Sequence, residues 1–462
     1  MSSKSLIRAI NLFVFNIKTI ENACYNIGNQ QDIRIQGVFK MELHFPSNFL
    51  WGSTTAAYQV EGNNYNSDFW AEEHAEGSPY KDKSGDTIDH YRFYREDIAL
   101  MASLGLNTYR FSIEWSRIET EPGQYSRSAI EHYRDVLETC HKHGITPVVA
   151  MHHFSSPKWL MRLGGWASPE VPDRFANYCE VVFRELGHLI PYALTMNEIN
   201  LPVMLREIFS KIGFIPPVGI DRDAWAAPKW RESAAKLCGT TIENYFTFHM
   251  ISDESSIEIL KETHQKAREA IKMIQPNTKV GLSMALSDIQ TISGGEEIAA
   301  QKWQSYFRQY LPMLEGDDFF GLQNYTREVY GPEGQVRPAE GEELTQMGYE
   351  FYPGALANVI RKVKKDLSIP IIITEHGIAT DEDTRRVEFI GKALEGVQAC
   401  LNEGIDVRGY LHWTTFDNFE WQSGYSMKFG LIEVDRSTQE RKVKESARYL
   451  GSIAQLNTLI QK

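Results

Sequence analysis

The sequence has few cysteines, no excess of positive charge and no long uninterrupted hydrophobic run. Its five cysteines are far apart and form no C-x-x-C pair; they are Cys24, Cys140, Cys179, Cys238 and Cys400. This spacing excludes the dense disulfide framework that stabilises small secreted domains. We interpret the cysteines as small buried apolar residues, and we expect a reducing, cytoplasmic location.

Positive charge is scarce, because 48 Lys and Arg residues stand against 61 Asp and Glu residues and the net charge is −13. An acidic chain repels phosphate backbones and anionic lipid surfaces. We therefore expect neither a nucleic-acid partner nor a membrane partner.

The first 40 residues differ in character from the rest. The apolar segment Leu6 to Ile20 loosely resembles a signal peptide, but it is interrupted by Asn11, Asn16 and Lys18 and no small-residue cleavage site follows it. It is also too short and too polar to span a bilayer. From Met41 onward the sequence reads as the start of a folded domain. We predict that residues 1–40 are an extension and that residues 41–462 are one domain.

The remaining chain shows no linker, repeat or low-complexity tract, although its length would allow about three domains of about 150 residues. Short apolar runs instead alternate with amphipathic helical stretches such as 128–143 and 384–403. The predicted strands are Phe49–Thr54, Asn107–Ser112, Thr146–His152, Tyr192–Asn197, Lys279–Met284, Phe319–Gln323, Ile369–Glu375 and Val407–Trp413. Eight such units predict an α/β fold, a single (β/α)8 TIM barrel, with 199–278 and 324–352 as long insertions at its C-terminal face.

Two glutamates follow predicted strands at the end of the barrel where chemistry is expected. Glu198 ends the run Thr195-Met196-Asn197-Glu198, and Glu375 lies in Thr374-Glu375-His376-Gly377. A lone carboxylate beside an apolar run is costly and could be a salt-bridged rim residue. A pair of carboxylates is what glycoside hydrolysis requires, because one must protonate the leaving oxygen while the other attacks or stabilises the anomeric carbon.

Six segments in order resemble glycoside hydrolase family 1, the β-glucosidase and β-galactosidase family. The resemblance extends from about Phe45 to Leu450 and rests on FLWGSTTAAYQVEG (49–62), YRFSIEWSRIETEPG (109–123), HHFSSPKWL (152–160), TMNEIN (195–200), ITEHG (373–377) and HWTTFDNFEWQSGYSMKFGLIEVD (412–435). It implies that Glu198 is the general acid/base and Glu375 the nucleophile of a retaining enzyme. It also implies that Asn197 binds the 2-hydroxyl of the sugar. Retention requires carboxyl groups about 5 to 5.5 Å apart.

The resemblance assigns further residues. Arg110 matches the arginine that keeps the nucleophile anionic, and Tyr325 matches the tyrosine that donates a hydrogen bond to it. The implied sugar-binding residues are Gln59, His153, Trp413, Glu420 and Trp421. The family chemistry uses no metal and no cofactor. A carboxylate at 420 favours a sugar without phosphate, and Glu198 in place of glutamine indicates O-glycosides.

Two positions depart from the family pattern. Ile199 stands where the family mostly has proline, and His376 stands where it mostly has asparagine. Because His376 adjoins a carboxylate, we expect it to titrate in the working pH range and to shift the pH profile. The insertion also contains aromatic residues that are either acceptor platforms or packing residues, namely Trp225, Trp230, Tyr245 and Phe246.

The predicted function is that of a retaining β-glycosidase. It would hydrolyse terminal non-reducing β-D-glucosyl residues from short β-glucosides or oligosaccharides, with β-galactosides and β-fucosides as further candidates. Interception of the intermediate by a sugar or alcohol would give transglycosylation. A catalytically silent barrel that binds glycans is the alternative from another class, and retention of both glutamates argues against it. The sequence leaves the oligomeric state open.

Overall fold

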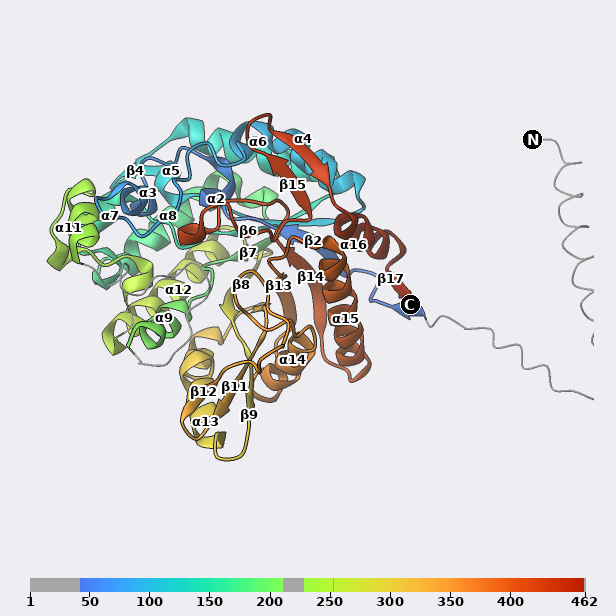
Figure 1. Ribbon diagram of the computed structural model, residues 1–462. Helices are drawn as coiled ribbons and strands as arrows, with labels where there is room; N and C mark the ends of the chain where they lie inside the picture. The colour runs from blue at the N-terminus through green and yellow to red at the C-terminus, as the bar shows by residue number, and fades with distance from the viewer. Residues whose placement is uncertain (1–41, 211–227, 252, 461–462) are drawn as a thin grey trace, which may run out of the picture. The chain divides into compact units, whose positions relative to one another are not determined.

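A closed barrel of eight parallel strands forms the centre of the molecule (Figure 1). The computed structural model describes residues 42–210, 228–251 and 253–460. The barrel strands follow one another in chain order, and the last pairs with the first. They are β2 (Leu50–Thr54), β3 (Thr108–Ser112), β6 (Thr146–Ala150), β7 (Tyr192–Leu194), β8 (Lys279–Ala285), β10 (Phe319–Asn324), β13 (Ile371–His376) and β14 (Val407–Trp413). The predicted (β/α)8 fold and its eight strands are confirmed, with ends that differ by a few residues.

Both faces of the barrel strands are buried, which explains why these strands read as continuous apolar runs. Alternate residues of one strand pack into different hydrophobic clusters. Ile372 belongs to a small cluster with Val148, Leu194 and Leu411, whereas Ile371 and Ile373 belong to the large core cluster. Since successive side chains of a strand point to opposite faces, the small cluster fills the barrel and the large one packs beneath the helices.

The helices that surround the barrel are amphipathic. In α6 (Arg127–Lys142), the predicted stripe Ile130, Tyr133, Leu137 and Cys140 is buried, and Ser126 caps the first turn by accepting a hydrogen bond from the Ala129 amide. The other long helices are α4 (His90–Ser103), α8 (Val171–Leu186), α12 (Glu254–Ile274), α13 (Glu296–Tyr306), α14 (Ala355–Asp366), α15 (Asp383–Asn402) and α16 (Glu445–Leu456).

The predicted insertion 199–278 is too long. Its last part is α12, which packs along α8 as a barrel helix and leads directly into β8. The apolar face of α12 includes Leu260, Ala267 and Ile271, all buried in the main core. Only the preceding part, with α9 (Leu201–Ser210) and α11 (Pro228–Leu237), is extra to the barrel repeat.

Smaller elements complete the fold. A three-stranded sheet of β12 (Gly334–Val336), β11 (Arg327–Gly331) and β9 (Asp288–Thr291) extends from one side of the barrel (Figure 1). Two-stranded sheets join β1 (Glu42–His44) to β17 (Thr458–Ile460), β4 (Glu119–Glu121) to β5 (Gln124–Tyr125), and β15 (Ile432–Asp435) to β16 (Glu440–Val443). The short helices are α2 (Ala57–Glu61), α3 (Asp68–His74), α5 (Trp115–Ile118) and α7 (Lys158–Arg162).

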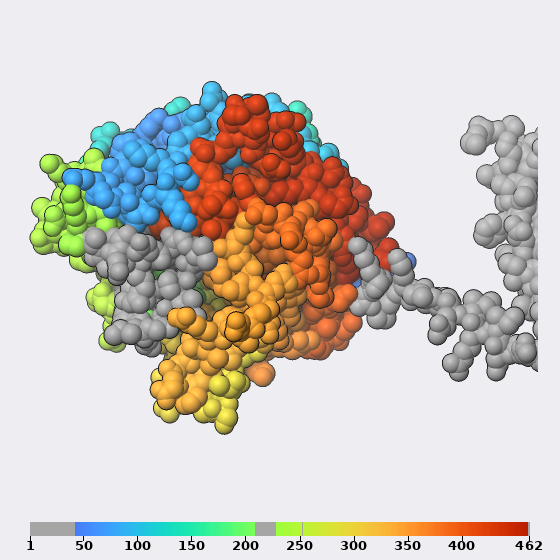
Figure 2. All heavy atoms as spheres, in the orientation of Figure 1, coloured from blue at the N-terminus to red at the C-terminus, as the bar shows by residue number. Residues whose placement is uncertain are grey.

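The early and late parts of the chain share one surface. Figure 2 shows the blue and red segments side by side, in agreement with the pairing of β14 with β2. Cys140, Cys179, Cys238 and Cys400 are buried and free, as expected, and Cys24 lies outside the described residues. No helix in the described ranges is long and apolar enough to cross a membrane.

Candidate active site

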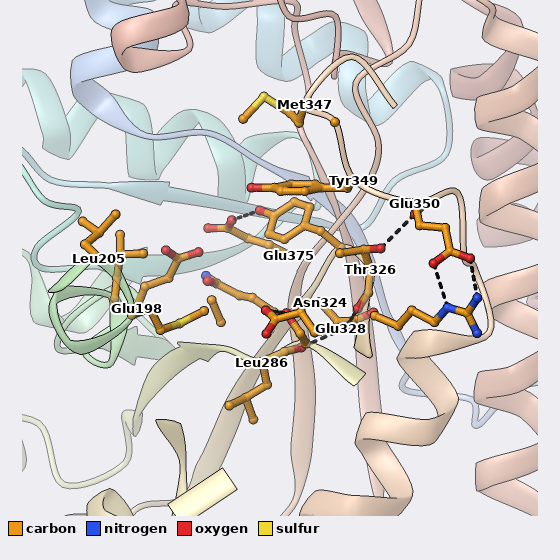
Figure 3. A pocket seen from close by; sticks show the side chains of 18 of the residues that line it. Glu198, Leu205, Leu286, Asn324, Thr326, Glu328, Met347, Tyr349, Glu350 and Glu375 are labelled. Atoms are coloured by element: carbon orange, nitrogen blue, oxygen red, sulfur yellow. Dashed lines mark hydrogen bonds and ion pairs between the residues drawn. The ribbon is translucent and has the colours of Figure 1, made fainter. Parts of the chain in front are cut away.

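A cavity of about 500 Å³ opens at the carboxyl ends of the barrel strands. Figure 3 shows Glu198, which follows β7, and Glu375 of β13 both reaching into it. Seven of the ten predicted site residues line it: His153, Glu198, Tyr325, Glu375, Trp413, Glu420 and Trp421. The other three, Gln59, Arg110 and Asn197, lie behind this lining and hydrogen-bond to it. The structure therefore brings all ten residues to one place.

Glu375 is held by two partners from other parts of the barrel. It lies within β13 and is only 2% exposed. Arg110 of β3, fully buried, donates from Nη1 to Glu375 Oε1 at 2.5 Å, and the Tyr325 hydroxyl donates to Oε2. Since both oxygens accept strong hydrogen bonds, the position of this carboxylate is fixed before any ligand arrives.

Glu198 has different surroundings. It follows β7, which ends at Leu194 and not at Asn197 as predicted. The chain leaves the extended conformation here, because Glu198 adopts a left-handed φ of 45°. Its side chain faces the cavity, and no group among the described residues hydrogen-bonds to its carboxylate. A left-handed backbone is uncommon for a residue other than glycine and is often found where a side chain must be aimed at a functional site.

The two carboxyl groups differ in their affinity for a proton. Burial raises the pKa of Glu198 well above its ordinary value, and the negative charge of Glu375 raises it further. Burial also raises the pKa of Glu375, but the Arg110 guanidinium and the Tyr325 hydroxyl counteract this. The pKa of Glu198 is therefore the higher of the two, so the proton that the pair retains resides on Glu198.

Asn197 is positioned by residues that the sequence reasoning did not assign. Its Oδ1 accepts hydrogen bonds from Arg110, from Gln323 Nε2 at 2.7 Å and from Ser283 Oγ at 3.2 Å. Its Nδ2 lies 3.3 Å from His153 Nε2. Gln323 and Ser283 are polar residues within the apolar strands β10 and β8, and that pattern is the signal that could have identified them.

A further wall of the cavity is formed by the residues predicted to bind sugar, with Gln59 behind it. Gln59 of α2 donates from Nε2 to the Phe419 carbonyl at 2.8 Å and to Glu420 Oε2 at 3.1 Å. His153 stacks on the indole of Trp413, with ring centroids 5.8 Å apart and an angle of 19°. Burial, followed by the charge of Glu375, raises the pKa of Glu420 to about 8. This wall offers aromatic faces beside amide and carboxyl groups, the combination that holds a sugar ring.

The prediction for His376 was wrong. Its side chain lies against Phe389, and its Nδ1 makes a 2.9 Å hydrogen bond with the Tyr410 hydroxyl. Burial lowers the pKa of His376 to about 3, so it stays neutral in the working pH range. Strand alternation explains this, because neighbours on β13 point to opposite faces and only Glu375 reaches the cavity.

The aromatic residues of the insertion serve packing where they are described. Trp230 and Tyr245 are fully buried, and Phe246 packs against the main core. None of the three lines the cavity. Trp225 lies outside the described residues.

Within the described ranges, no group of three His, Cys, Asp or Glu side chains could hold a metal ion. His152 is buried beside Trp166 and contacts Ser156 Oγ. His141 bonds to the Leu189 carbonyl at an exposed helix end.

Comparisons with known proteins agree with this geometry. The family model described as glycosyl hydrolase family 1 matches residues 41–459. The chain is 30% identical to β-glucosidase A of Thermotoga maritima, over 90% of this chain and 98% of that protein. It is 49% identical to the crystal structure of β-glycosidase BGL167, with a TM-score of 0.83 and coverage of 89% and 97% of the two chains. The Thermotoga maritima β-glucosidase in complex with glucoimidazole is 25% identical, with a TM-score of 0.75 and coverage of 90% and 99%. The chain belongs to glycosyl hydrolase family 1 and is a glycoside hydrolase of the β-glucosidase type.

Proposed function

We propose that the protein is a retaining β-glycosidase that removes terminal non-reducing β-D-glucosyl residues from short β-glucosides by double displacement. The observation that carries this proposal is the unequal pair at the ends of two strands. Glu375 is paired with a cation and a phenol, whereas Glu198 is buried without either. The catalytic domain comprises residues 41–462 in this proposal, and residues 1–40 lie outside it.

In the first step, a Glu375 oxygen attacks the anomeric carbon and the bond from that carbon to the aglycone oxygen breaks. Glu198 gives its proton to the departing oxygen, so the aglycone leaves as a neutral alcohol. Arg110 and Tyr325 supply what this step needs from Glu375, because they favour its anionic form and hold it in one orientation.

In the second step, Glu198 is an anion and acts as the base. It takes a proton from a water molecule, whose oxygen attacks the anomeric carbon and displaces Glu375. Two inversions restore the β configuration. A sugar or alcohol in place of water would give a new β-glycoside, so transglycosylation is the accompanying activity.

The sugar-binding wall favours a glycone without phosphate. Glu420 and Gln59 form a hydrogen-bonded pair that can exchange bonds with sugar hydroxyls, and neither residue is a cation that could pair with a phosphate group. The glucoimidazole complex of the Thermotoga maritima relative supports a glucosyl-shaped ligand in this family. Galactosyl and fucosyl groups present most of the same hydroxyls and are further candidate substrates.

The test is to incubate the purified protein with nitrophenyl β-glucoside, β-galactoside, β-fucoside and 6-phospho-β-glucoside while NMR records the anomer formed first. We expect turnover of the β-glucoside with initial release of β-glucose and no turnover of the 6-phospho compound. Initial release of the α-anomer would contradict the retaining mechanism. An inactive protein that still binds glucosides would instead support a silent glycan-binding barrel.

A further inference from the structure

The cavity extends beyond the sugar-binding wall, on the far side of Glu198. Its volume of about 500 Å³ lies within the range of pockets that enclose drug-sized ligands. In Figure 3, Leu205, Leu286 and Met347 lie around the carboxyl pair, and all three line the cavity. The character of this part of the cavity decides which aglycones fit.

One wall of this part is apolar because a helix begins directly after the catalytic strand end. The amide of Leu201 donates to the Glu198 carbonyl, and α9 starts there. Leu201, Met204 and Leu205 follow the spacing that places side chains on one helix face, and all three line the cavity. Leu286, which follows β8, adds to this wall, and Met347 lies across from it in Figure 3.

Two charged side chains at this end are engaged within the protein. Glu328 accepts hydrogen bonds from Ser287 and Tyr330, and Arg327 pairs with Glu350. A sugar hydroxyl that binds to either charged group would compete with these bonds.

Asn324 Nδ2 donates to the carbonyls of Leu286 and Thr326, whereas Asn324 Oδ1 and Gln335 Oε1 are buried without a hydrogen-bond partner among the described residues. Arg337 and Glu342 also line the cavity, but both are exposed to solvent, where charges interact weakly with ligands. A polar group that loses water without gaining a hydrogen bond weakens binding.

We infer that the aglycone part of this cavity selects an apolar alcohol, alkyl or aryl, over a second sugar. The inference rests on the proposed function, because it assumes that Glu198 and Glu375 cleave the bond between the two parts of the cavity. The ring of Tyr349, which lies over the carboxyl pair in Figure 3, is compatible with either kind of aglycone, since aromatic faces stack on aryl groups and on sugar rings alike. The choice is made by the apolar wall, which gains from contact with an apolar chain and offers no hydrogen bond to a sugar hydroxyl.

The test compares kcat/KM for methyl, butyl, hexyl and octyl β-glucoside and for cellobiose, with nitrophenyl β-glucoside as the reference. The octyl compound is kept below its micelle concentration. All but the reference have alcohol leaving groups, and a sugar hydroxyl is the more acidic of these, so chemistry alone would favour cellobiose. We expect kcat/KM in the alkyl series to rise about threefold for each methylene that contacts the apolar wall. The value for octyl β-glucoside should exceed the value for cellobiose.

Two variants locate the effect. The quantity to compare is kcat/KM for octyl β-glucoside divided by kcat/KM for methyl β-glucoside. Met204→Gln should lower this ratio by at least about threefold, the effect expected when roughly one methylene is no longer buried. Met347→Gln is the second variant, in case the first is unstable. Met273→Gln is the matched control, since Met273 is 83% exposed on α12, and its ratio should equal that of the wild type.

The outcomes separate the two claims. If nitrophenyl β-glucoside is not hydrolysed, the proposed function fails. If it is hydrolysed but the alkyl series is flat, or cellobiose equals octyl β-glucoside, only the inference about the aglycone is overturned. An unchanged ratio in both Met204→Gln and Met347→Gln would overturn it as well.

Discussion

The surroundings of Glu198 and Glu375 contrast two ways of keeping the same chemical group inside a protein. Glu375 is inside a strand and bonded through both oxygens, whereas Glu198 is on a left-handed residue after its strand and has no bonded partner among the described side chains. Burial raises the pKa of both carboxyl groups, and the partners of Glu375 oppose that rise. Identical side chains thereby acquire opposite roles, since neighbouring charges and hydrogen bonds decide which one holds the proton.

The largest effect is expected from removing the paired carboxylate. Glu375→Gly should lower kcat for nitrophenyl β-glucoside by at least about 10⁴-fold, because the group that forms the covalent intermediate is gone. Added azide should restore turnover and yield the α-glucosyl azide, which NMR identifies. Wild-type activity in this variant would refute the assignment of the nucleophile.

Removing the unpaired carboxyl should have a selective effect. Glu198→Ala should lower kcat/KM for alkyl glucosides by about 10²- to 10⁴-fold, since these leaving groups need a proton. Nitrophenyl glucosides, which leave as weakly basic anions, should lose far less in the same comparison. Equal losses for both kinds of leaving group would argue against an acid role.

A smaller change tests the partners of Glu375. Tyr325→Phe removes one hydrogen bond to a charged group and should cost about 10- to 100-fold in kcat/KM. Because that bond lowers the pKa of Glu375, its loss should move the acidic limb of the pH profile to higher pH. Tyr65→Phe, at a residue 58% exposed, is the control and should leave the profile in place. A fixed acidic limb in Tyr325→Phe would show that Tyr325 does not act through Glu375.

The smallest expected effect is on the pH dependence of stability, and it comes from Glu420, a third carboxyl group, which has no ion-pair partner among the described residues. The folded-state pKa of Glu420 is about 8, against an ordinary value of 4.5, so the folded protein keeps a proton that the unfolded chain releases between these values. The contribution of this group to stability is therefore lost as pH rises through that window. Glutamine does not titrate. Glu420→Gln should gain about 2 °C or more in Tm relative to wild type between pH 5 and pH 8 in thermal unfolding. A constant difference in Tm would contradict the raised pKa.

The sequence predicts the barrel well because its strands are buried on both faces and separated by amphipathic helices. The limits of the insertion were harder to predict. The stretch from 199 to 278 contains no strand, so nothing in its pattern separated α12, which covers the barrel, from α9 and α11, which do not.

The site shows a similar division. Motif residues such as Arg110 and Glu420 were found because they stand in distinctive segments, and the structure places them around one cavity. Gln323 and Ser283 were missed because their role depends on which strands follow β7 around the barrel, a fact of tertiary structure. His376 was misjudged from its position beside Glu375 in sequence, although the two-residue period of a strand separates them in space.

Asn197 gives the site a fixed hydrogen-bond polarity. Arginine can only donate, so Asn197 Oδ1 must accept and its amide cannot flip. Its Nδ2 is then the donor toward His153 Nε2, which makes Nδ1 the protonated nitrogen of a neutral imidazole. The permanent charge of Arg110 thus decides which atom donates and which accepts in each hydrogen bond from Arg110 through Asn197 to His153. A ligand hydroxyl that meets these groups encounters donors and acceptors already assigned, and its own hydrogen must rotate to match them.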